Sequence, residues 1–305
     1  MVTLASPGWN KLNQKEKEKY KNRAKEMRGV KTGSSASAGG GGLDAHGRSL
    51  QLDNLGQDVA DKIFYVMNAS VFAKFTELSK TDETITWIPA ELAVSKFSIN
   101  SGLIAAYQAF PLPGQLPVGS KWECFQKEKK ILVPLTPEDS GFNKEDKEIF
   151  QDLRAFLGST KTVFVMPELE EQVRGVLDQI SKRSELPSLG LTYLSLPRLM
   201  SKLKIASCKT EKEKTITVAE LEKGKTITMA ELEKGKFLYS GSLGCDHHEQ
   251  VDTAKCCQTM LVSWIFTVLD LCCPAFNIQI IPGIHSPAPA KLIKPVTWKA
   301  ANTNR

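Results

Sequence analysis

The sequence predicts an α/β fold, a mixed sheet with flanking helices, preceded by a basic helix and a flexible linker. Between residues 51 and 285, apolar runs of strand length alternate with segments of helical periodicity. A Gly- and Ser-rich stretch at 32–50 cannot bury a core, so we predict that it is a linker between the α/β domain and a separate segment at 1–31. An apolar content of 41% is sufficient for a real core.

The net positive charge of the chain is concentrated in its first 31 residues. Residues 1–31 hold nine Lys or Arg against three Glu, which equals the net charge of +6 of all 305 residues. Apolar residues at near-helical spacing predict one amphipathic helix that ends at Gly29: Trp9, Leu12, Tyr20, Ala24 and Met27. This concentration of positive charge favours a polyanionic partner for that segment.

The pattern W-x-x-L-x-x-x-E-K-x-K-Y-x-x-x-A in this helix resembles the later part of an HMG box, a DNA-bending module. The first helix of a box and its wedge side chain are absent, so we expect electrostatic, salt-sensitive binding of RNA or DNA. The candidate nucleic-acid-binding residues are Lys11, Lys15, Lys19, Arg23, Lys25 and Arg28.

Several elements are expected in the first half of the α/β domain. Strands are predicted at Lys62–Met67, Thr84–Ile88 and Leu92–Ile99, the last two forming an antiparallel hairpin. Gly102–Phe110 is expected to be helical, and Pro111–Pro117 to be loop.

The second half alternates helices and strands. Asn143 is expected to cap a helix that carries Ile149, Leu153 and Phe156, and Pro167 to lead into a helix with acidic residues in its first turn. The other predicted elements are a buried parallel strand at Thr162–Met166, a strand at Leu191–Ser195, a short helix from Pro197 to Leu203, an apolar helix at Met260–Cys273 and a last strand at Phe276–Ile281. This order is that of a ribonuclease-H-like domain.

An eleven-residue unit occurs twice in tandem at 214–235, differing only at Val218 and Met229. Two copies are too few for a solenoid, so we expect an enlarged surface loop.

Residues 286–305 are expected to be an irregular tail. The apolar run 260–273 is too short for a membrane span and no signal peptide is evident, so we expect an intracellular protein without a membrane partner and with reduced cysteines.

Residues 245–257 gather two of the four histidines and three of the seven cysteines. Cys245, His248 and Cys256 form a C-x2-H-x7-C pattern, and thiolate and imidazole are ligands that suit zinc. A structural zinc site needs a fourth ligand. Side chains alternate between the two faces of a strand, which places Glu91 on the sheet face that carries Phe97 and Ile99. A buried carboxylate there is costly unless it is paired or binds a metal. The alternative is that Glu91 lies at the strand end and reaches water.

The segment W-I-P-A-E-L-A-V-S-K-F-S-I at 87–99, followed far downstream by C-x2-H-x7-C, resembles the Maelstrom family. The resemblance implies a ribonuclease-H-like domain with a zinc site formed by Glu91, Cys245, His248 and Cys256, with His247 and Cys257 outside it. It also implies a germline factor of the Piwi-interacting RNA pathway that acts in transposon silencing, meiosis and gametogenesis. Such a factor binds single-stranded RNA, works with Piwi-pathway proteins, and resides in perinuclear cytoplasmic granules and the nucleus.

The ligand spacing constrains the local structure. On a continuous helix residues 248 and 256 would lie about 12 Å apart along the axis, whereas a His and a Cys reach one zinc over roughly 10 Å. We therefore expect 245–252 to be partly non-helical, with a later helix capped by Asp252.

The sequence argues against a two-metal nuclease. No D-x-E motif occurs in the first three predicted strands, and a zinc ion with four protein ligands has no open position for water. His285 is an isolated candidate acid or base, and we name no catalytic residue. Two alternatives to RNA binding stay open: a metal-independent endonuclease of single-stranded RNA, and a zinc-stapled scaffold for protein partners.

Overall fold

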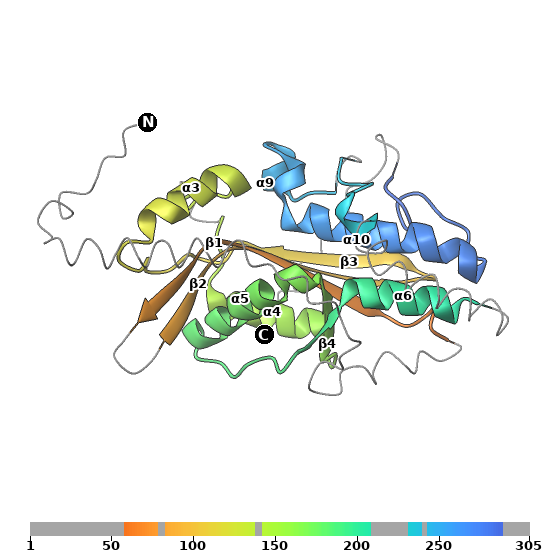
Figure 1. Ribbon diagram of the computed structural model, residues 1–305, viewed down its shortest axis with the longest axis horizontal. Coiled ribbons are helices and arrows are strands. Elements are labelled where there is room, and N and C mark those ends of the chain that lie inside the picture. Colours follow the sequence, from red (N-terminus) through yellow and green to blue (C-terminus); the bar gives the residue numbers. More distant parts are fainter. Residues whose placement is uncertain (1–57, 79–82, 138–141, 209–230, 240–242, 289–305) are drawn as a thin grey trace, which may run out of the picture. The chain divides into compact units, whose positions relative to one another are not determined.

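The computed structural model describes residues 58–78, 83–137, 142–208, 231–239 and 243–288 (Figure 1). The predicted basic helix with its six candidate residues, the linker, the first copy of the tandem repeat and the tail beyond residue 288 lie outside the described residues.

A five-stranded mixed sheet forms the centre of the domain, with the strand order β3-β2-β1-β4-β5. The antiparallel part comprises β1 (Phe64–Leu78), β2 (Glu83–Ser98) and β3 (Gly102–Ala109). The short strands β4 (Thr162–Val165) and β5 (Thr192–Ser195) add to β1 in parallel. The α/β class and the mixed sheet are therefore as predicted.

The predicted hairpin between Thr84–Ile88 and Leu92–Ile99 is wrong, because both segments belong to the single strand β2. Pro89 lies where the register between β1 and β2 shifts, opposite Val71. A register irregularity tolerates a residue without an N–H group, so proline interrupts the ladder without ending the strand. The antiparallel partners of β2 are β1 and β3.

The helix expected at Gly102–Phe110 is also wrong, since this segment is the edge strand β3. Its pairing along β2, from Leu92 opposite Ala109 to Ser98 opposite Gly102, overrides the local composition. Gly102 has a φ of +63°, and an added Cβ would overlap the backbone of Ile284, so the turn into β3 requires glycine.

Helices α4 (Asp146–Leu157) and α5 (Glu170–Arg183) cover one face of the sheet (Figure 1). The predicted sequence of buried strand, proline and acidic helix start is confirmed, with a 3-10 turn η2 (Pro167–Leu169) before α5. The expected cap of α4 is wrong. Its N-cap is Glu145, and the Asn143 side chain instead donates hydrogen bonds to the carbonyls of Phe110 and Pro111.

The other face is covered by α10 (Cys257–Cys272), which packs in one apolar cluster with α6 (Leu196–Ala206). Both helices were predicted. The strand expected at Phe276–Ile281 is wrong: a 3-10 turn η4 (Cys273–Phe276) ends at Asn277 with φ +58°, and the described residues that follow, up to 288, form an isolated bridge between Pro282 and Ser286 but no strand. The left-handed residue and Pro282 prevent a continuous ladder there.

The helical stretch Cys257–Phe276 has 20 residues and a mean hydropathy of 1.7, so its length and composition alone would allow it to cross a membrane. It is longer than the run that the sequence suggested. In this structure 67% of it is buried, with α10 packed on the sheet as a core helix.

A further helix, α3 (Lys121–Ile131), was not predicted. Only Cys124 in it is buried, so it lacks the apolar stripe by which an amphipathic helix is recognised.

Helix α5 packs closely on β2 through Gly175, where an added Cβ would overlap the indole of Trp87. We expect Gly175→Ala to lower the free energy of unfolding by about 1–3 kcal/mol, although alanine alone would favour a helix by about 1 kcal/mol. Denaturant unfolding measures this, with Asp178→Ala at an exposed position of α5 as the control. Removing the indole with Trp87→Ala should recover part of the loss, and a Gly175→Ala variant more stable than the parent would contradict the packing.

Candidate metal centre

Glu91 lies in the middle of β2 with no exposed surface, on the face covered by α10 and opposite Ser70 of β1. The alternation predicted for this strand is confirmed, because Ala93 and Phe97 belong to the α10 cluster whereas Leu92 and Val94 belong to the opposite one. The alternative prediction, that Glu91 reaches water at the strand end, is wrong. A carboxylate in this position needs polar partners or a cation.

Cys245, His248 and Cys256 come from a broken helical segment before α10. Cys245 is the N-cap of the short helix α9 (Asp246–Glu249), and its Sγ accepts a hydrogen bond from the His248 backbone N–H at 3.3 Å. A 3-10 turn η3 (Thr253–Lys255) then precedes Cys256, where α10 is capped. The expected interruption between 248 and 256 is confirmed. Asp252 does cap, but it caps η3 through the Ala254 N–H and not α10.

The structure brings Glu91, Cys245, His248 and Cys256 together, with their ligand atoms all within 4.8 Å of one another and all four residues buried. Cys245 Sγ lies 3.3 Å from His248 Nδ1, and Cys256 Sγ lies 3.3 Å from Glu91 Oε1. Metal bonds of about 2.0–2.3 Å in a tetrahedron separate ligand atoms by roughly 3.3–3.8 Å. The cluster therefore has the donor set and nearly the spacing of a four-coordinate metal site.

Hydrogen bonds from two neighbouring groups orient the Glu91 carboxylate. The Cys257 backbone N–H donates to Oε2 at 2.9 Å, and the Gln108 amide of β3 donates to Oε1 at 2.6 Å. Burial raises the pKa of Glu91, while the nearby His248 and the Cys257 N–H act to lower it. Hydrogen bonds to a metal-ligating carboxylate fix its orientation, so Gln108 would act as a support of the ligand.

The two candidate thiol ligands differ in their electrostatic surroundings. A hydrogen bond from Cys256 lowers the pKa of Cys245 well below its usual value, and His248 adds to this effect. The same interaction raises the pKa of Cys256, together with burial and the Glu91 charge. Burial tends to lower the pKa of His248, but Cys245 and Glu91 raise it overall.

The ring orientation of His248 is fixed by helix α3. Its Nε2 donates to the carbonyl of Ile131 at 3.0 Å, which leaves Nδ1 facing the cluster. The neighbouring His247 donates through Nε2 to the carbonyl of Leu132 at 2.6 Å. Leu132 is the left-handed C-cap of α3, so both histidines bind carbonyls at the end of that helix.

Aromatic rings shield this side of the cluster. Phe110 and Phe142 stack with centroids 4.3 Å apart, and the His247 ring meets Phe142 edge-on at 4.9 Å. His247 was expected outside the ligand set, and it acts here by packing and by its bond to α3. Cys257 likewise contributes its backbone N–H, while its side chain is buried.

Sequence reasoning missed Gln108 and the carbonyls of α3. Gln108 lies in the segment expected to be helical, so nothing in the sequence indicated that it lies beside β2.

His285, the isolated candidate acid or base, is buried: its Nε2 donates to the Asn100 carbonyl at 3.1 Å, and its Nδ1 accepts from the Ile281 N–H. With both ring nitrogens engaged, it holds a loop in place.

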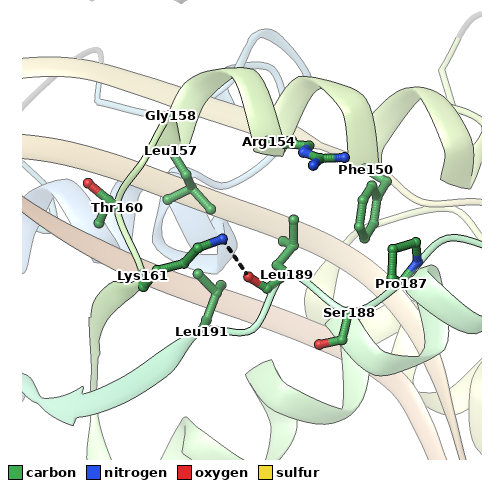
Figure 2. A pocket seen from close by; sticks show the side chains of 10 residues that line it. All are labelled: Phe150, Arg154, Leu157, Gly158, Thr160, Lys161, Pro187, Ser188, Leu189 and Leu191. Atoms are coloured by element: carbon green, nitrogen blue, oxygen red, sulfur yellow. Dashed lines mark hydrogen bonds between the residues drawn. The ribbon is translucent and has the colours of Figure 1, made fainter.

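A separate pocket of about 170 Å³ lies between α4 and the segment that leads into β5 (Figure 2). Arg154 and Lys161 line it, and Lys161 donates to the Leu189 carbonyl at 3.2 Å. No Asp, Glu, His or Cys lines this pocket, so it does not resemble an acid–base or metal site.

The fold and the cluster together define a mixed α/β domain with a buried Glu-Cys-His-Cys group that can hold a metal ion. A family model described as "Maelstrom: piRNA pathway germ-plasm component" matches residues 80–292. The chain belongs to the Maelstrom family, which confirms the resemblance seen in the sequence.

Curated relatives agree with this assignment. The chain is 24% identical over 317 residues to Protein maelstrom of Drosophila melanogaster, a match that covers 93% of this chain and 65% of the relative. It is also 24% identical to Protein maelstrom of Drosophila erecta, over 82% of this chain and 58% of the relative, and to the homolog of Culex quinquefasciatus, over 93% and 59%. The chain thus spans less than two thirds of the length of these relatives.

The adjacent cysteines allow a sharp test of the cluster. We expect Cys256→Ser to lose bound metal and to unfold at a lower temperature, because metal binding free energy contributes to folding. Cys257→Ser is the matched control and should keep its metal. Elemental analysis of purified protein measures both, and equal metal content in the two variants would refute the assignment.

Gln108→Leu should weaken metal affinity by about 10–100-fold while leaving the four ligands in place, because it removes a hydrogen bond that orients Glu91. Competition with a chromogenic chelator measures this. Gln115→Leu, an exposed position beyond β3, serves as the control. An unchanged affinity would show that Glu91 needs no support from β3.

Proposed function

We propose that this protein is an RNA-associated germline factor of the Piwi-interacting RNA pathway that acts in transposon silencing and gametogenesis and binds single-stranded RNA. The observation that carries this proposal is the match of a piRNA-pathway family model over residues 80–292. Its partners would be single-stranded RNA and Piwi-pathway proteins, in perinuclear cytoplasmic granules and the nucleus.

The domain is proposed to be ribonuclease-H-like. Three antiparallel strands are followed by helices α3 and α4, the parallel strand β4, helix α5 and the parallel strand β5, an order that agrees with that assignment. Among the described residues, two carboxylates are buried. Glu91 belongs to the metal cluster, and Asp152 is paired with the Lys144 ammonium at 2.9 Å and Tyr107 at 3.3 Å. A two-metal nuclease holds its ions with several carboxylates, and these two buried carboxylates are already engaged with other groups.

The metal is proposed to be zinc in a structural role. Two thiols, an imidazole and a carboxylate are a donor set that suits zinc, and four protein ligands leave no position for a water molecule. When bound, zinc would supply neutralising charge for the buried thiolates and Glu91. The residues themselves join β2 to the start of α10, and through His248 to the end of α3.

The segment at 1–31 is proposed to add electrostatic affinity for RNA, and DNA is a weaker candidate partner because the box-like pattern is partial. When a protein binds a single strand, the logarithm of the binding constant falls linearly with the logarithm of the salt concentration. Each phosphate contact by a basic side chain steepens that slope by about 0.7.

One binding experiment separates RNA binding from the two alternatives. Purified full chain is incubated with a labelled single-stranded RNA at several salt concentrations, with and without EDTA. We expect binding without cleavage, and a shallower salt dependence when Lys11, Lys15, Lys19, Arg23, Lys25 and Arg28 are replaced by Gln.

Cleavage that persists in EDTA would favour the metal-independent endonuclease. Absence of binding at low salt would contradict the proposal and favour the protein scaffold. A variant with Gln at Lys62, Lys182 and Lys234, three basic positions of the α/β domain, serves as the control for loss of positive charge.

A further inference from the structure

Helix α3 exposes two aromatic side chains that its packing does not use. Trp122 is 71% exposed and Phe125 is 43% exposed, whereas Cys124 on the opposite side of the helix is fully buried. The two rings lie side by side, with centroids 6.3 Å apart and planes inclined by 34°. A tryptophan this exposed covers no core, so its presence on the surface is not explained by folding.

The helix that carries these rings has an excess of positive charge. The helix contains Lys121, Lys127, Lys129 and Lys130 against Glu123 and Glu128. Glu128 is engaged as the acceptor of the Leu135 N–H at 2.8 Å. None of the four ammonium groups forms an ion pair with another residue in the part of the chain that the structure describes, and Lys129 lies over the Phe125 ring at 4.4 Å.

Packing and hydrogen bonds anchor α3 on the side opposite its exposed face. Cys124 packs in the apolar cluster that also contains Phe72 and Val133. The carbonyls of Ile131 and Leu132 accept the hydrogen bonds of His248 and His247. A platform fixed in this way loses little conformational entropy when a ligand binds to it.

We propose that the exposed face of α3, formed by Trp122, Phe125 and Lys129, is a stacking platform for the bases of single-stranded RNA. The inference rests on the proposed RNA-binding function and places it on one helix. Neighbouring aromatic rings accept successive bases irrespective of sequence, and lysines beside them meet the phosphates. This interleaving of rings with unpaired positive charges favours a polyanion with π-faces over an apolar protein partner.

The test uses the full chain and a fluorescently labelled 12-nucleotide oligouridine, with affinity measured by anisotropy at 150 and 300 mM salt. We expect the Trp122→Ala/Phe125→Ala double variant to bind at least about tenfold more weakly at both concentrations, since stacking on one aromatic side chain changes affinity by roughly that factor. Trp122→Phe keeps a ring and should bind within about threefold of the parent. Lys129→Glu should weaken binding more at 150 mM than at 300 mM.

Tyr239→Ala removes another aromatic residue that is 80% exposed, and it is the matched control expected to leave affinity unchanged. Metal content and melting temperature should be the same in all variants, because the substituted side chains are on the surface. Parent-like binding by the double variant would overturn the placement on α3 and leave the proposed function standing. A parent protein that fails to bind oligouridine even at 50 mM salt would overturn the proposed function itself.

Discussion

A carboxylate that is held away from water in the middle of a sheet must be compensated, and much of this domain is arranged around that requirement at Glu91. The backbone at the start of α10 donates to one carboxylate oxygen, and Gln108 of the edge strand donates to the other. The Cys256 thiol and His248 complete the surroundings. These groups come from β2, β3 and the segment before α10, so compensating one buried charge draws distant parts of the chain together.

Hydrogen bonds also connect this cluster and the neighbouring His247 to helix α3. His248 is oriented by a carbonyl of α3, and reciprocally α3 is held by His248 and His247. The outward face of that helix carries the exposed aromatic and basic residues, while its inward residue Cys124 packs near the cluster. The proposed metal centre would therefore support the proposed binding surface, and a site with four protein ligands and no open coordination position agrees with such a role.

The elements governed by local chemistry were predictable. Strand β4, the proline after it and the acidic start of α5 follow from buried apolar residues and the helix dipole. Alternation predicted the face of β2 on which Glu91 lies but not its complete burial, and ligand reach predicted the helix break before Cys256. The continuity of β2 through Pro89, the strand β3 and the position of Gln108 were not predictable. They depend on pairing between segments and on a register shift, which a single sequence does not display.

The two faces of the sheet can be covered by their helices at different stages of synthesis. The apolar cluster beneath α4 and α5 draws on residues between Tyr65 and Tyr193, so its parts are all present once the first two thirds of the domain has been synthesised. The opposite cluster needs α10, which comes more than 150 residues after Glu91. Closing so long a loop is entropically costly, and contacts of this separation form slowly. During synthesis on the ribosome, the face of β1 and β2 that carries Glu91 stays uncovered until the last quarter of the chain emerges.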